Sequence, residues 1–99
     1  MSTSQSNAIA PAIVSVKGGS GVEIANGGTT NETSVIIAGE GGKHIELMDG
    51  RRGLGAVSAD STGRWTFSMT EWSLGLHSIT AHASSGTSLP WTFTVVPNK

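Results

Sequence analysis

The 99-residue chain has no cysteine and no tyrosine, and only 13% of its residues are charged. Without cysteine it can form neither a disulfide nor a zinc–thiolate site. No stretch approaches the roughly 20 apolar residues of a membrane-spanning helix, so no membrane insertion is expected. The net charge of −1 creates no field that would attract nucleic acid or anionic lipid. The few basic side chains are therefore expected to lie solvated in loops, without a nucleic-acid partner.

The start of the chain also lacks two features, a basic first segment and a sustained apolar run. Residues 1–10 therefore contain no conventional secretory signal, and their polar, aperiodic sequence predicts a flexible leader. One folded domain is expected over residues 11–97, because a chain of this length can bury enough surface for one core.

What the sequence does contain is 14 glycines, many serines and threonines, and a series of short alternating segments. About seven such segments follow one another at a spacing of roughly ten residues. They cover residues 13–16 (continued at 22–24), 34–38, 43–48, 54–59, 64–69, 77–83 and 91–95. No segment shows apolar residues at helical spacing over a length sufficient for a helix. Asp49-Gly50, which follows the segment at 43–48, predicts a tight reversal. The pattern predicts an all-β fold, either a sandwich or a small barrel.

The stretch SADSTGRWTF, residues 58–67, raises the question of a functional site. Asp60 can accept backbone N–H bonds in an Asx-turn, and Gly63 can supply the positive φ of a tight reversal. Trp65 and Phe67 then share one face of the following strand, which the flanking alternation makes the core face. We interpret the stretch as a turn and a core strand. The alternative is a site in which Asp60 acts as a ligand and Trp65 as a binding surface.

The alternation of apolar and polar residues along the strands predicts which side chains form the core. His77 shares its parity with Ile79, so it is expected to point inward or to the edge of the core. A histidine that bonds the preceding loop can do the work of the tyrosine corner of sandwich domains. The residues expected to carry the fold are Ile13, Val35, Ile37, Ile45, Leu47, Trp65, Phe67, Leu74, His77, Ile79, Trp91 and Phe93.

The three histidines are the candidates for a transition-metal site. His77 and His82 face opposite sides of one strand, because their positions differ by an odd number, five. His44 and Glu46 share a face but provide only two ligands, which make a weak site. We therefore expect no metal ligands among these residues.

Catalytic patterns are missing too. The chain has no Gly-x-Ser-x-Gly elbow, no cysteine nucleophile and no visible pair of carboxylates, so we predict no enzyme and no catalytic or cofactor-binding residue. Calcium needs six to eight oxygens, and acidic residues are few. A weak calcium alternative stays open, with a partial oxygen set from loop carbonyls and the carboxylates of Glu40, Asp49 and Asp60.

Trp72 has two open interpretations, because it lies in a loop and not in an alternating strand. In one, it is a lid that covers the core. In the other, it is an exposed contact for a ligand, since a tryptophan is seldom left idle on a surface. Trp72 is therefore the one possible ligand contact that the sequence offers.

Five segments occur in an order that points to a family: TSVIIAG, IELMDG, LGAVSADSTGRWTFSM, GLHSITAHA and WTFTVV. Over about residues 11–96 the chain resembles the bacterial Ig-like repeat of large surface proteins and adhesins. That family shows Ala-Asp-x-x-Gly-x-Trp and Gly-x-His-x-Ile-x-Ala in the same order. The resemblance implies an Ig-like β-sandwich of about seven antiparallel strands in a Greek key.

The resemblance also implies a function. It suggests a non-catalytic spacer or adhesion repeat, extracellular or at the cell surface, with neighbouring Ig-like modules of a longer chain as partners. Family adhesins often lack a conventional N-terminal signal, in agreement with the leader. Some related repeats bind calcium at acidic loops. This chain has few acidic residues, so the resemblance is not extended to calcium binding. The alternative function is a carbohydrate- or protein-binding module that contacts a glycan or a surface protein through Trp72 and the neighbouring loops.

Overall fold

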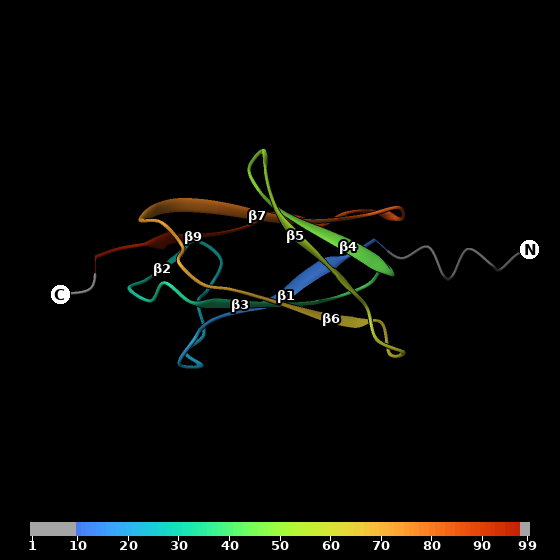
Figure 1. The fold of residues 1–99 in the computed structure, drawn as a ribbon, viewed down its shortest axis with the longest axis horizontal. Coiled ribbons are helices and arrows are strands. Elements are labelled where there is room, and N and C mark those ends of the chain that lie inside the picture. The colour runs from blue at the N-terminus through green and yellow to red at the C-terminus, as the bar shows by residue number, and fades with distance from the viewer. Residues whose placement is uncertain (1–9, 98–99) are drawn as a thin grey trace, which may run out of the picture.

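The structure is a computed structural model, and it describes residues 10–97. In this range the chain forms no helix, and its strands make two sheets that pack face to face (Figure 1). The strands are β1 (Ala12–Gly18), β2 (Gly28–Thr30), β3 (Val35–Glu40), β4 (His44–Asp49), β5 (Arg52–Ser58), β6 (Arg64–Met69), β7 (Gly75–Ala83), β8 (Gly86–Thr87) and β9 (Trp91–Val95). The leader predicted over residues 1–10 lies, apart from its last residue, outside the described range.

The two sheets differ in size. The smaller has the strand order β1-β3-β6, and the larger has the order β2-β9-β7-β4-β5, with β8 paired to β7. The chain crosses between the sheets repeatedly, for instance from β3 to β4 and from β6 to β7. Neighbouring strands are antiparallel except β2 and β9, which run parallel. The parallel pair is formed by β2, which is not among the segments for which antiparallel strands were expected.

Seven of the strands lie on the segments that alternate in the sequence. The other two, β2 and β8, were not predicted, because they are only three and two residues long and carry no apolar alternation. Backbone pairing with β9 and β7 makes them strands. The reversal predicted at Asp49-Gly50 is present: Asp49 pairs with Arg52, and Gly50 has a φ of +62°.

The core lies between the two sheets and follows from the alternation. In β4, Ile45 and Leu47 are fully buried, whereas His44 and Glu46 are exposed. The buried apolar residues are Val16, Ile24, Val35, Ile37, Ile45, Leu47, Trp65, Trp72, Ile79, Ala81, Phe93 and Val95. The predicted core residues that are only partly buried and pack against this cluster are Ile13, Phe67 and Trp91.

The core assignment of Leu74 is wrong. Its side chain is 61% exposed, whereas Trp72, two residues earlier, is 3% exposed. Both lie in the loop between β6 and β7, where no strand alternation sets the direction of a side chain. The backbone N–H of Trp72 donates to the carbonyl oxygen of Thr33 (3.0 Å), and this bond ties Trp72 to the segment before β3. The loop therefore sends Trp72 into the core and leaves Leu74 outside.

The turn before β6 has the hydrogen bonds of an Asx-turn. Oδ1 of Asp60 accepts the backbone N–H groups of Thr62 (2.8 Å) and Arg64 (3.1 Å), and Gly63 has a φ of +85°. After the turn, Trp65 is buried and its Nε1–H donates to the carbonyl oxygen of Gly41 (3.2 Å). Residues 58–67 therefore form a turn and a core-facing strand.

The chain enters and leaves the sandwich at opposite ends (Figure 1). β1 starts beside Glu40, where β3 finishes, and β9 finishes beside Gly75, where β7 starts. Within the described residues, no helix is available that could span a membrane.

Candidate functional site

A small cavity lies between the β4–β5 hairpin and the loop from β6 to β7. Its volume is about 200 Å³. Its lining residues are Asp49, Arg52, Leu54, Met69, Glu71, Trp72, Ser73 and His77. Because the cavity brings together a histidine, two carboxylates, an arginine and the loop tryptophan, it is the candidate site.

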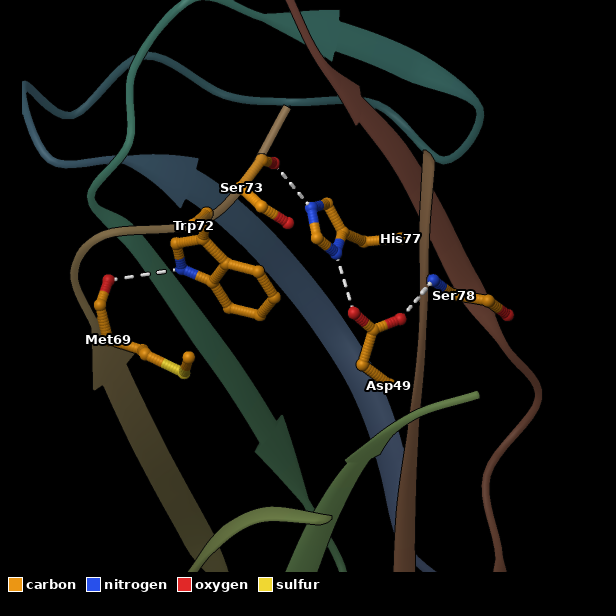
Figure 2. A network of polar contacts seen from close by, with 6 residues as sticks. All are labelled: Asp49, Met69, Trp72, Ser73, His77 and Ser78. Atoms are coloured by element: carbon orange, nitrogen blue, oxygen red, sulfur yellow. Dashed lines mark hydrogen bonds and ion pairs between the residues drawn. The ribbon is translucent and has the colours of Figure 1, made fainter. Parts of the chain in front are cut away.

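The centre of the cavity wall is a pair formed by His77 and Asp49 (Figure 2). Nδ1 of His77 lies 2.5 Å from Oδ2 of Asp49, and Nε2 lies 2.8 Å from the carbonyl oxygen of Ser73. The other carboxylate oxygen of Asp49 accepts the backbone N–H of Ser78 (2.9 Å). His77 is 6% exposed, so this network is almost closed to solvent.

The ring of His77 therefore faces an acceptor on each side. The ring is thus held between the carboxylate of Asp49, at the end of β4, and the loop carbonyl of Ser73. The contact with Ser73, four residues upstream in the preceding loop, is the type of contact that the sequence predicts for this histidine.

Trp72 packs beside this network (Figure 2). Its ring meets the rings of His77 and Phe93 edge-on, at centroid distances of 4.9 Å and 5.3 Å. Its Nε1–H donates to the carbonyl oxygen of Met69 (3.1 Å), so its polar atom is satisfied inside the protein. With 3% of its surface exposed, Trp72 is a lid on the core, and the expectation of an exposed ligand contact is wrong.

Backbone strain helps to turn Trp72 inward. Glu71, the residue before it, has a φ of +64°, and no other non-glycine residue in the described range has a positive φ. This conformation costs roughly 1–2 kcal/mol for an L-residue. It is retained because the reversal that it makes delivers the large Trp72 side chain to the core. The strain is therefore explained by packing.

The cavity is small for a ligand site. Its 200 Å³ lie below the roughly 300–1,000 Å³ of pockets that bind small molecules. Its exposed charges are of both signs, from Arg52 and Glu71. The cavity could hold one side chain of a partner. Because its exposed charges are of both signs, they favour neither a cationic nor an anionic side chain.

The His77–Asp49 pair is not free to act as a general base. A general base needs a nitrogen or oxygen free to take a proton from a substrate. Both nitrogens of His77 and both carboxylate oxygens of Asp49 are engaged inside the protein. We therefore assign the pair to holding the β4–β5 hairpin and the β6–β7 loop against the start of β7.

Asp49 is the member of this network that sequence reasoning missed. It is 28 residues from His77 and was assigned to the reversal at Gly50 and to the weak calcium set. The pairing of β4 with β7 brings it to His77, since Asp49 is directly opposite Ile79. The register between β4 and β7 cannot be inferred from the local sequence of either strand.

The remaining predicted residues lie elsewhere. Asp60 belongs to its own turn and Glu40 is exposed at the end of β3, so neither lines the cavity with Asp49. In residues 10–97, no three His, Asp or Glu side chains group as metal ligands. Calcium binding stays a prediction.

Two carboxylates outside the cavity, those of Asp60 and Glu32, have lowered pKa values. The hydroxyl of Thr62 is the main cause for Asp60, whose pKa lies below its ordinary value of 3.8. The hydroxyl and the backbone N–H of Ser20 do the same for Glu32, whose pKa lies below 4.5. The exposed Asp60 thereby holds its own turn, whereas the half-buried Glu32 connects the segment before β3 to Ser20, in the loop after β1.

No protein-family model matches this chain, and no curated protein or solved structure matches it. Its function is therefore inferred from its residues and its fold.

Proposed function

We propose that the chain is a non-catalytic Ig-like module of a bacterial extracellular or cell-surface protein, where it serves as a spacer or adhesion repeat. The observation that carries the proposal is the position of the chain ends, which leave the sandwich at opposite ends (Figure 1). Modules joined through such ends extend in a row. The partners of this module are then its neighbours in a longer chain.

The strand order supports an Ig-like Greek key. The order β1-β3-β6 in one sheet and β9-β7-β4-β5 in the other parallels the A-B-E and G-F-C-C′ sheets of Ig-like sandwiches. In that comparison β7 takes the place of strand F, near whose start the tyrosine corner lies. His77 lies near the start of β7 and bonds the loop upstream. A histidine thus stands where the corner tyrosine would be.

The pairing of the end strands suits a spacer under tension. β1 belongs to the smaller sheet and β9 to the larger. A force on the two ends acts along these strands, whereas their hydrogen bonds run across the strands. Many bonds of β1 with β3, and of β9 with β2 and β7, must therefore break together.

The alternative, glycan or protein binding through Trp72, loses its contact residue. Trp72 is buried and its N–H is already bonded to Met69. No exposed aromatic platform lies in this loop. We do not propose this alternative.

A length measurement tests the spacer. Three copies are joined through their own terminal residues, and small-angle scattering compares them with one copy. We expect the maximum dimension to grow with the number of copies. The control joins three copies through long Gly/Ser linkers, which behave as flexible coils. A native-linked trimer as compact as, or more compact than, this control would contradict the proposal.

A further inference from the structure

The turn Asn26-Gly27 is fastened to the start of β9. Oδ1 of Asn26 accepts the backbone N–H of Thr92 (2.9 Å), and Nδ2 donates to the carbonyl oxygen of Pro90 (3.2 Å). The N–H of Gly27 donates to the carbonyl oxygen of Thr92 (2.7 Å). Close by, Nε1–H of Trp91 donates to the carbonyl oxygen of Ile24 (3.2 Å). We call these four bonds the β9 clamp.

Asn26 and Gly27 form an Asn-Gly pair, a dipeptide that is prone to deamidation. The chain has four asparagines, and Asn26 is the one followed by glycine. Glycine has no Cβ, so its backbone nitrogen is sterically free and its chain can take unusual angles. Such a nitrogen, once deprotonated, can attack the carboxamide carbon of the asparagine before it.

The reaction balances with water as the only co-reactant. The backbone nitrogen of Gly27 bonds to Cγ of Asn26, the Cγ–Nδ2 bond breaks, and ammonia leaves with the proton from Gly27. The product is a five-membered succinimide. Water then opens either of its two C–N bonds and leaves aspartate or isoaspartate at position 26.

We propose that Asn26 is a spontaneous deamidation site that the β9 clamp holds closed. In the closed form the Gly27 N–H is bonded to Thr92, and the carboxamide is held on Pro90 and Thr92. Neither the nitrogen nor Cγ is free for the attack. The reaction proceeds only from an opened state in which the start of β9 has detached, so its rate follows the population of that state.

Modification prevents the clamp from closing fully. In aspartate, an oxygen replaces Nδ2 and faces the carbonyl oxygen of Pro90, so two acceptors meet. In isoaspartate, the backbone gains a carbon before Gly27, which moves the N–H of Gly27 away from Thr92. A temporary opening of β9 thereby becomes a permanent loosening.

The test compares deamidation at Asn26 in buffer and in concentrated urea at the same pH and temperature. Peptide mapping by mass spectrometry measures the replacement of NH₂ by OH, with an isoaspartate assay beside it. We expect the folded chain to react at least roughly tenfold more slowly, equivalent to about 1.4 kcal/mol of opening free energy. Equal rates in the two conditions would overturn the proposal, as would modification in urea at Asn7, Asn31 or Asn98 instead.

Two variants sharpen the comparison. Trp91→Phe keeps the Asn-Gly pair but removes the bond to Ile24, so we expect severalfold faster reaction in buffer and an unchanged rate in urea. Circular dichroism verifies that this variant is folded; if it is not, the wild-type comparison alone decides. Asn26→Gln in urea should abolish the fast reaction, because it cannot form the five-membered ring. A Trp91→Phe chain that is folded yet reacts at the wild-type rate would contradict the role of the clamp.

Discussion

At the scale of single residues, the contact between Asp49 and His77 is the most consequential polar contact of the core. Asp49→Asn replaces one of the two acceptor oxygens with an NH₂ group, so the side chain can accept a hydrogen bond at only one of its two contacts, with His77 or with Ser78. We expect Asp49→Asn to lower the free energy of unfolding by about 1–3 kcal/mol, measured as a shift of the urea midpoint. The control is Glu23→Gln, which removes the exposed ion pair with Lys17 (3.8 Å). Equal midpoints for the two variants would show that His77 does not need Asp49.

Trp72 provides the second residue-scale prediction. Because it is buried and packs on His77 and Phe93, Trp72→Ala should cost about 3–5 kcal/mol and unfold much of the protein. Leu76→Ala, at a position 70% exposed, should change little. Thermal unfolding compares the two variants. A Trp72→Ala chain with the stability of wild type would contradict the assignment of Trp72 to the core.

The Asp60 turn predicts a dependence on pH. Its folded pKa lies below the ordinary 3.8, chiefly because the Thr62 hydroxyl bonds the carboxylate. The ionised turn therefore stabilises the fold above about pH 3.8, and this contribution is lost as the pH falls through the folded pKa. Carbon NMR of the Asp60 carboxyl should give a midpoint below 3.8, and Thr62→Val should raise it. A midpoint at 3.8 or higher in wild type would refute this account.

At the scale of elements, the pairing of β3 with β6 depends on a close approach. Gly39 lies directly opposite Trp65, and a Cβ at position 39 would overlap the indole ring and the carbonyl oxygen of Ala12. We expect Gly39→Ala to cost about 1–3 kcal/mol through overpacking. Gly53→Ala in β5 is the matched control, because the nearest atom, on Glu46, would be 3.9 Å from the new Cβ. Urea midpoints measure both, and a harmless Gly39→Ala would show that the sheet can shift to make room.

The positions of most strands could be predicted from the sequence, for a physical reason. A half-buried strand must alternate apolar and polar residues, so β4 and β6 can be recognised from their own side chains. β2 and β8 could not, because backbone pairing alone defines them. The burial of Trp72 as a lid was one of two interpretations open in the sequence, but the exposure of Leu74 could not be predicted, since the path of this loop depends on the positive φ of Glu71.

The site was harder to predict than the strands. Its central contact joins the end of β4 to the start of β7, and a register between strands leaves no mark in either segment. The inward parity of His77 and its bond to the preceding loop were open to sequence reasoning, because both are local. Asp49 was visible only as a turn residue before Gly50.

At the scale of the whole molecule, the fold suits the proposed role of a module that is joined to others. The described chain enters the sandwich at one end and leaves it at the other, β1 and β9 belong to different sheets, and the His77–Asp49 pair is engaged in hydrogen bonds within the protein (Figures 1 and 2). Each feature contributes to a stable shape with a defined direction. We infer that the shape is what the protein provides.

The most direct test of that claim is the size and place of the protein that carries this domain. An antibody to the domain is used on a blot of fractionated source cells. The account predicts a band far above the 10.1 kDa of this chain, at the cell surface or in the medium. A band near 10.1 kDa in the cytosol would mean that the domain acts alone, and it would contradict the spacer function.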